Sequence, residues 1–176
     1  LLDYLDSSGQ RENTIVIFTS DHGEACGDHG LILKGCRFYE GLVRVPLMIS
    51  WPGHFQSDVV SDELVELMDL TPTLYDLIGM EIPNYVQGRS LIPVLKGEAD
   101  QHREFVRCEY HGGVDGPDQT HATMYRDRRW KLICYHGKGG LCELYDLEND
   151  PWEHQDLSGS AEYRDVKWEL IQKSMD

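Results

Sequence analysis

The chain has 176 residues, of which 40% are hydrophobic, and a formal net charge of -15. This length fits one domain or one large part of a longer protein, with enough apolar side chains to bury a core. The acidic balance argues against a nucleic-acid partner, because no basic cluster in the sequence outweighs the acids. No apolar run approaches the about 18 residues of a membrane-spanning helix, so no transmembrane segment is expected.

The cysteines are odd in number and show no CxxC spacing; they are Cys26, Cys36, Cys108, Cys134 and Cys142. The sequence therefore predicts neither a zinc ribbon nor a complete disulfide framework, and it leaves open which one or two pairs could form. The chain starts at Leu1 without an initiator methionine or a signal peptide. We expect it to be the C-terminal part of a longer protein. The N-terminal part of that same protein is then the partner against which this part folds.

The first elements in chain order predict an αβ unit. Leu1, Leu2 and Leu5 share one apolar helical face, and Gly9 is placed to end that helix. Residues 14–18 form a β-branched and apolar run, apolar on both faces, which is typical of a strand buried in a parallel sheet. Residues 43–51 predict a second buried strand.

Residues 64–78 follow with helical spacing. Asp69 is placed to cap this helix, and Pro72 is tolerated in the first turn, where backbone amides lack helical partners anyway. The apolar side chains expected on its inward face are Leu70, Leu74, Leu77 and Ile78.

From about residue 104, short strands replace this pattern, at 104–110, 122–126, 130–135 and 141–145. They predict a four-stranded antiparallel sheet, which residues 161–175 close as a helix. The predicted fold class is α/β, with a core part over residues 1–100 and an antiparallel-sheet subdomain over residues 101–176. The basic cluster in this sheet, interpreted as a solvated strand face, comprises Arg126, Arg128, Arg129 and Lys131.

Candidate ligand-binding side chains follow the first strand directly, at Asp21 and His22. Ligands of open α/β sheets bind beyond the carboxyl ends of the strands. A carboxylate and an imidazole there can bind one metal ion, and Gly23 lets the backbone turn sharply after them. A capping aspartate beside a surface histidine is the alternative, and the position leaves both interpretations open.

The glycine-rich loop of residues 19–41 carries further candidates. Lys34 supplies a point charge for an oxyanion such as sulfate or phosphate, or is a solvated surface lysine. His29 is a candidate proton donor to a leaving oxygen, or a histidine that packs in the loop. Glu40 and Arg44, four residues apart, favour a structural ion pair.

Three segments, in this order, resemble the sulfatase family of the alkaline-phosphatase superfamily. They are TSDHGE with GDHG and Lys34 ahead of YEGLVRVPLMISWPG, then LVELMDLTPTLYDLIGMEIPNYVQGRSLIPVLKG, then RRWKLICYHGKGGLCELYDLENDPWEHQDLSG. Together they cover nearly all of the chain. The resemblance implies the C-terminal part of an alkaline-phosphatase-like mixed sheet with helices, followed by the small antiparallel sheet.

Position by position, Asp21 and His22 resemble the second pair of metal ligands in sulfatases, and Lys34 resembles the lysine that contacts the scissile sulfate. His29 lies in the GDHG segment, near the site in some branches. Many family members have Asn where His22 stands, and imidazole also suits metals other than calcium. The resemblance implies a divalent metal, with Ca²⁺ expected and Mn²⁺ or Zn²⁺ as alternatives.

The nucleophile of the family has no counterpart in this sequence. It is a formylglycine made from the Cys or Ser of a C/S-x-P-x-R motif, and no Cys or Ser here has that spacing. The first Asp-Asp metal pair is absent too. A calcium site needs about six to eight ligand atoms, of which Asp21 and His22 supply at most three. We expect formylglycine upstream, and this segment alone to bind metal weakly and to be inactive.

The resemblance thus predicts a sulfuric ester hydrolase acting on a sulfated small molecule or glycan. His111, in the loop of residues 111–121, is a candidate substrate contact, because such loops commonly set specificity. The alternatives are a phosphodiesterase or phosphonate monoester hydrolase of the same superfamily and a non-catalytic binding module. The resemblance implies a periplasmic or secreted protein, although the His22-bearing branches also include cytoplasmic enzymes.

Overall fold

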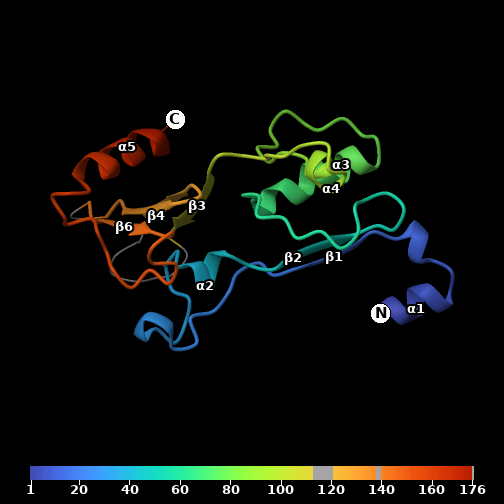
Figure 1. Ribbon diagram of the computed structural model, residues 1–176, viewed down its shortest axis with the longest axis horizontal. Helices are drawn as coiled ribbons and strands as arrows, with labels where there is room; N and C mark the ends of the chain where they lie inside the picture. The colour runs from blue at the N-terminus through green and yellow to red at the C-terminus, as the bar shows by residue number, and fades with distance from the viewer. Residues whose placement is uncertain (113–120, 138–139, 176) are drawn as a thin grey trace. The chain divides into compact units, whose positions relative to one another are not determined.

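The computed structural model describes residues 1–112, 121–137 and 140–175 (Figure 1). The chain separates into two compact units, one of residues 1–21 with 45–103 and one of residues 22–44 with 104–176. The division at residues 100 and 101 stays a prediction. None of the described helices is both long enough and apolar enough to cross a bilayer.

The first unit opens as the sequence predicts. Helix α1 (Leu2–Ser7) buries Leu5, and Gly9 follows it with a φ of 69°, a backbone conformation that suits glycine. The 3₁₀ turn η1 (Arg11–Asn13) then leads into strand β1 (Val16–Thr19), which pairs antiparallel with β2 (Leu47–Ser50).

The expectation that the first strand is buried in a parallel sheet is wrong within this chain. The described partner of β1 runs antiparallel, in a two-stranded sheet. Phe18 of β1 and Met48 of β2, which lie opposite one another, are 57% and 59% exposed. An apolar run indicates a strand, but the direction of its partner depends on tertiary contacts that the run does not contain.

Helix α3 (Leu70–Leu77) follows the 3₁₀ turn η3 (Leu67–Asp69) and packs near α4 (Ile92–Leu95). The predicted inward face is wrong at Leu74 and Ile78, which are exposed, whereas Leu70 and Leu77 are half-buried. Pro72 and Thr73 are buried instead. Asp69 precedes α3 as expected, but its side chain makes no hydrogen bond that caps this helix. The buried side of α3 is therefore set by polar contacts as well as by apolar ones.

The second unit is built on the predicted four-stranded antiparallel sheet, in the order β3-β4-β5-β6. Its strands are β3 (Val106–His111), β4 (His121–Arg126), β5 (Trp130–Tyr135) and β6 (Cys142–Asp146). A disulfide joins Cys134 to Cys142, which lie opposite one another on β5 and β6. Cys26, Cys36 and Cys108 are not disulfide-bonded.

Helix α5 (Arg164–Met175) lies along one face of this sheet (Figure 1). Its Leu170 packs in a core cluster with Tyr125, Leu132 and Leu144. The prediction of a helix that closes the sheet is thus confirmed, although the helix begins at Arg164 and not at residue 161.

Residues 37–42, which belong to the same unit, pack on the opposite face of the sheet. Side chains alternate along a strand, so Lys131 points away from the side on which Leu132 meets α5. Arg37 lies over the Tyr135 ring, 5.2 Å from its centroid. The short helix α2 (Glu40–Val43) follows, and its Leu42 is 3% exposed. The candidate loop is therefore packed on the C-terminal sheet.

Candidate functional site

Asp21 and His22 lie just past the end of β1, where the sequence placed them. Asp21 is exposed and His22 is half-buried. The Nδ1 atom of His22 donates a hydrogen bond to the carbonyl oxygen of Gly23, at 2.7 Å. A neutral imidazole that donates through Nδ1 carries its lone pair on Nε2, and metal-binding histidines are commonly oriented by such a bond.

Gly23 serves close packing rather than a turn with positive φ. It is not among the residues with positive φ, but a Cβ atom there would collide with the carbonyl oxygen of Gly41. The Gly23 amide donates to the Leu42 carbonyl oxygen at 2.8 Å. The loop therefore begins against α2, and only glycine permits the approach.

His29 is held by aromatic contacts. It lies in the 3₁₀ turn η2 (Asp28–Gly30) with a φ of 50°, an uncommon conformation for a residue other than glycine. Its ring stacks on that of Tyr39 with a centroid separation of 3.8 Å, and the His154 ring lies 5.6 Å away. These contacts support the interpretation of His29 as a packing residue, and its catalytic role stays a prediction.

Lys34 is exposed in the same loop. The structure shows no contact between Lys34 and either His29 or His111 in the part of the chain that it describes. Within residues 1–112, 121–137 and 140–175, no group of three or more His, Cys, Asp and Glu side chains is arranged to hold a metal ion. The roles of Asp21, His22 and Lys34 therefore stay predictions.

His111 ends β3 and lies opposite His121 of β4, with ring centroids 4.1 Å apart. Its Nε2 atom lies 3.1 Å from a carboxylate oxygen of Glu109, and the His136 ring lies 5.0 Å from that of His121. All three histidines are exposed. Most of the predicted specificity loop, residues 113–120, lies outside the described residues.

A cluster that sequence analysis missed surrounds Lys131, which is fully buried. The Nζ atom of Lys131 lies 2.7 Å from Glu40 Oε1 and 2.7 Å from Glu153 Oε1, and it donates to the Phe38 carbonyl oxygen at 2.9 Å. The interpretation of this lysine as part of a solvated face is wrong. The signal was its place as the one charged residue in the otherwise apolar strand of residues 130–135.

Arg44, the predicted partner of Glu40, is one of the charges that lower the pKa of Glu40, and the Glu40 carboxylate forms ion pairs with Lys131 and Arg126. Besides Lys131, Glu40 contacts Arg126 Nε at 3.3 Å, and its amide donates to Glu153 Oε2 at 2.6 Å. Burial by itself raises the pKa of Glu40, but the charges of Lys131 and Arg126 outweigh burial and lower it below the ordinary value. Burial raises the pKa of Glu153, because the attraction to Lys131 offsets only part of the cost.

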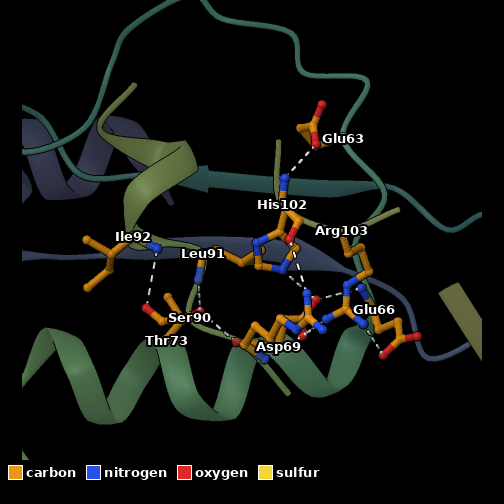
Figure 2. Close-up of polar contacts among 10 residues, drawn as sticks. Glu63, Glu66, Asp69, Thr73, Ser90, Leu91, Ile92, His102 and Arg103 are labelled. Atoms are coloured by element: carbon orange, nitrogen blue, oxygen red, sulfur yellow. Dashed lines mark hydrogen bonds and ion pairs between the residues drawn. The ribbon is translucent and has the colours of Figure 1, made fainter. Parts of the chain in front are cut away.

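A second buried cluster, in the first unit, surrounds Asp69, which is also fully buried (Figure 2). The amides of Glu66 and Arg89 each donate to its carboxylate at 2.8 Å. Arg103 forms an ion pair with the same carboxylate, and His102 Nε2 lies 3.2 Å from it. This cluster satisfies a buried charge and holds α3 in place, so we assign it a structural role.

The family model described as "N-sulphoglucosamine sulphohydrolase, C-terminal" matches residues 27–176 of this chain. Among curated proteins, N-acetylglucosamine-6-O-sulfatase of Bacteroides thetaiotaomicron is 34% identical over 176 residues, which are 98% of this chain and 31% of that protein. The chain spans about a third of the length of the curated relatives that it matches.

Two solved structures extend the likeness to the fold. A protein in complex with its substrate D-glucosamine-2-N,6-O-disulfate matches with a TM-score of 0.87 and 33% identity, over 98% of this chain and 35% of that chain. The phosphonate monoester hydrolase of Agrobacterium radiobacter matches with a TM-score of 0.84 and 30% identity, over 98% of this chain and 36% of that chain.

Proposed function

Since the chain belongs to the sulfatase family of the alkaline-phosphatase superfamily and matches its C-terminal part, we propose that the complete protein hydrolyses sulfate esters. The observation that carries this proposal is the family match over residues 27–176, which includes the loop that bears Lys34. We also propose that residues 1–100 complete the α/β core and that residues 101–176 form its C-terminal subdomain.

The substrate class that we propose is a sulfated carbohydrate, as a free sugar or a glycan. N-acetylglucosamine-6-O-sulfatase is the name of one relative, and D-glucosamine-2-N,6-O-disulfate is the substrate bound to one structural neighbour. The test is desulfation of glucosamine 6-O-sulfate and N-sulfate by the complete protein. Release of sulfate from neither sugar, but from an aryl sulfate, would contradict the carbohydrate assignment.

Asp21 and His22 are the residues of this chain that would hold a divalent cation, which we propose to be Ca²⁺. The donor types fit, and the hydrogen bond of His22 Nδ1 to Gly23 orients the imidazole. Further ligands must come from outside the described residues, since these contain no complete metal-binding group. When bound, such a cation would neutralise negative charge on a sulfate oxygen.

Lys34 is the residue that we propose to neutralise charge on the sulfate during the reaction. Its exposed ammonium suits a tetrahedral anion, which accepts hydrogen bonds from any direction. We keep His29 as a proposed proton donor and His111 as a proposed substrate contact. A formylglycine nucleophile is proposed for a part of the protein that precedes this chain.

Lys34→Ala in the complete protein tests this assignment. Removing one such donor typically costs a factor of about 10²–10³ in kcat, so that loss is expected in the hydrolysis of an aryl sulfate. Lys96→Ala is the matched control, since Lys96 is also an exposed lysine between Leu and Gly. Equal rates for the two variants would show that Lys34 does not contact the reacting group.

A phosphonate monoester hydrolase is the second candidate, favoured by the likeness to the Agrobacterium radiobacter enzyme. Assaying the complete protein against 4-nitrophenyl sulfate and bis(4-nitrophenyl) phosphate separates the two activities. We expect the sulfate to react faster, and a dominant phosphodiester rate would overturn that choice. Turnover of neither ester, with binding of a sulfated glycan retained, would favour a non-catalytic module.

The disulfide supports a compartment outside the cytoplasm, periplasmic or extracellular. Cys134 and Cys142 are bonded across β5 and β6, and such bonds persist mainly in oxidising compartments. Mass spectrometry of the native protein, alkylated before reduction, tests this proposal. Free thiols at both Cys134 and Cys142 would contradict this proposal and would favour a cytoplasmic protein.

A further inference from the structure

The ammonium of Lys131 contacts three oxygens. Its Nζ donates to the Phe38 carbonyl oxygen at 2.9 Å and forms ion pairs of 2.7 Å with the carboxylates of Glu40 and Glu153. Phe38 and Glu40 come from the candidate loop, and Glu153 follows β6 after a tight turn in which its φ is 58°. One side chain of β5 therefore joins two segments that are far apart in sequence.

Stability alone is a weak reason for this arrangement. Withdrawing charges from water is costly, and well-packed apolar side chains of the same volume often stabilise a protein as well as a buried ion pair does. A charged cluster with fixed acceptors does, however, admit one arrangement of its segments, since any displacement leaves a buried charge unpaired. Lys131 therefore fixes the position of residues 38–40, which an apolar residue in its place would not do.

These residues in turn fix the loop. Tyr39, between two residues that contact Lys131, stacks on His29 at 3.8 Å. His154, next to Glu153, lies 5.6 Å from the same ring. At the end of α2, the Leu42 carbonyl accepts the Gly23 amide at 2.8 Å, next to His22. The anchored segment therefore contacts the loop both at its start and at His29.

We propose that Lys131, through Glu40 and Glu153, is a positioning residue that holds the loop of residues 22–36 in the shape that the sulfate site requires. The residue acts through the loop and does not touch the substrate. The inference rests on the proposed function where it concerns activity, whereas the anchoring of the loop can be measured without any substrate.

The test is the double variant Lys131→Met/Glu153→Gln of the complete protein. It removes one positive and one negative charge together and leaves the ion pair of Glu40 with Arg126. Glutamine at position 153 retains an oxygen that can accept the Glu40 amide. Because no buried charge is left alone, this variant should fold, whereas Lys131→Met by itself leaves the Glu153 carboxylate without its cation.

The matched control is Lys173→Met/Glu169→Gln, the same pair of substitutions at an ion pair of 2.6 Å on α5. Both side chains of this pair are about half exposed or more, so no segment depends on them. Its hydrogen exchange and its kinetics should equal those of the wild type.

Two readouts decide the inference. Hydrogen exchange of the backbone amides of residues 22–44 should become at least about tenfold faster in the double variant, while amides of β4 and β5 keep their protection. The kcat/KM for an aryl sulfate should fall by about 10²-fold at a temperature where both proteins are folded, because small misplacements of positioned groups cost that much.

Unchanged exchange over residues 22–44 would overturn the anchor, whatever the activity. Faster exchange with an unchanged kcat/KM would overturn the positioning role. If the wild type does not hydrolyse sulfate esters, the proposed function fails by itself, and the exchange comparison still decides whether Lys131 anchors the loop.

Discussion

Each unit of the molecule has a fully buried charged side chain at the centre of a cluster, Asp69 in the first and Lys131 in the second, and the two have opposite signs. In the first unit the carboxylate of Asp69 is surrounded by donors, among them two backbone amides. In the second unit the ammonium of Lys131 is surrounded by acceptors, two of them carboxylates. Two backbone amides and two side chains surround Asp69, whereas two carboxylates and one backbone carbonyl from distant segments surround Lys131.

The reach of the two clusters differs as well. The contacts of Asp69 span at most 34 residues of sequence, from Asp69 to Arg103. The bond from Lys131 to Phe38 spans 93 residues, and that from Glu40 to Glu153 spans 113. A buried charge with local partners organises its own unit. A buried charge with distant partners ties a chemistry-bearing loop to a rigid sheet.

Asp69→Ala should have the largest effect. It removes the carboxylate that contacts both Arg103 and His102 and leaves two amides without that acceptor, so we expect a loss of about 3–5 kcal/mol, although Arg103 keeps its ion pair with Glu66. Hydrogen exchange of the α3 amides measures this free energy of opening. Asp76→Ala, at an exposed carboxylate on the same helix, is the control and should cost far less. Similar losses of stability in the two variants would show that the contacts of Asp69 do not stabilise the first unit more than an exposed carboxylate does.

The disulfide is a support that the second unit has and the described first unit lacks. Cys134→Ser/Cys142→Ser opens a link between residues eight apart in sequence, which should lower the stability of the sheet by about 2–3 kcal/mol. Exchange protection of the β5 and β6 amides measures the loss. Full protection in the variant would show that the cluster around Lys131 and the core under α5 are sufficient.

The acid dependence of the second unit should separate its two carboxylates. The folded pKa of Glu40 lies below its ordinary value of 4.5, so Glu40 stabilises the fold above that pH and the gain is lost as pH falls through the folded pKa. The folded pKa of Glu153 is raised, so its contribution has the opposite sign and is lost as pH rises above 4.5.

Exchange protection of β4 and β5 between about pH 3 and pH 7 measures both effects. Glu40→Gln should reduce the loss of stability in acid, whereas Glu153→Gln should reduce the loss on the rise from pH 4.5. Identical pH profiles in the two variants would contradict the opposite shifts.

The smallest expected effect is at alkaline pH. Burial raises the pKa of Tyr135 to about 12 from an ordinary value of 10.0. The unfolded chain releases this proton near pH 10 and the folded chain only near 12, so stability should decline between these values as pH rises. Tyr135→Phe should flatten that decline. Ultraviolet absorbance of the phenolate follows the titration, and an ordinary pKa for this residue would contradict its burial.

The outcome at individual residues shows how far sequence reasoning reached. The four strands of the C-terminal sheet and the closing helix were predictable, because alternation and turn residues are local signals. The antiparallel pairing of β1 with β2 and the exposure of Phe18 were not, since a strand does not carry the identity of its partner. The place of Asp21 and His22 after β1 was predicted correctly, whereas their binding role stays a prediction.

By itself, the sequence determined the order of the elements and the family, because propensities, turn residues and motifs act over short stretches of chain. Only the tertiary structure decided which charges are buried. Lys131 reads as one member of a basic run, and it becomes a buried anchor because Phe38, Glu40 and Glu153 meet it on one face of the sheet. The cost of an unpaired buried charge makes that meeting specific, and no local pattern encodes a contact across 93 residues.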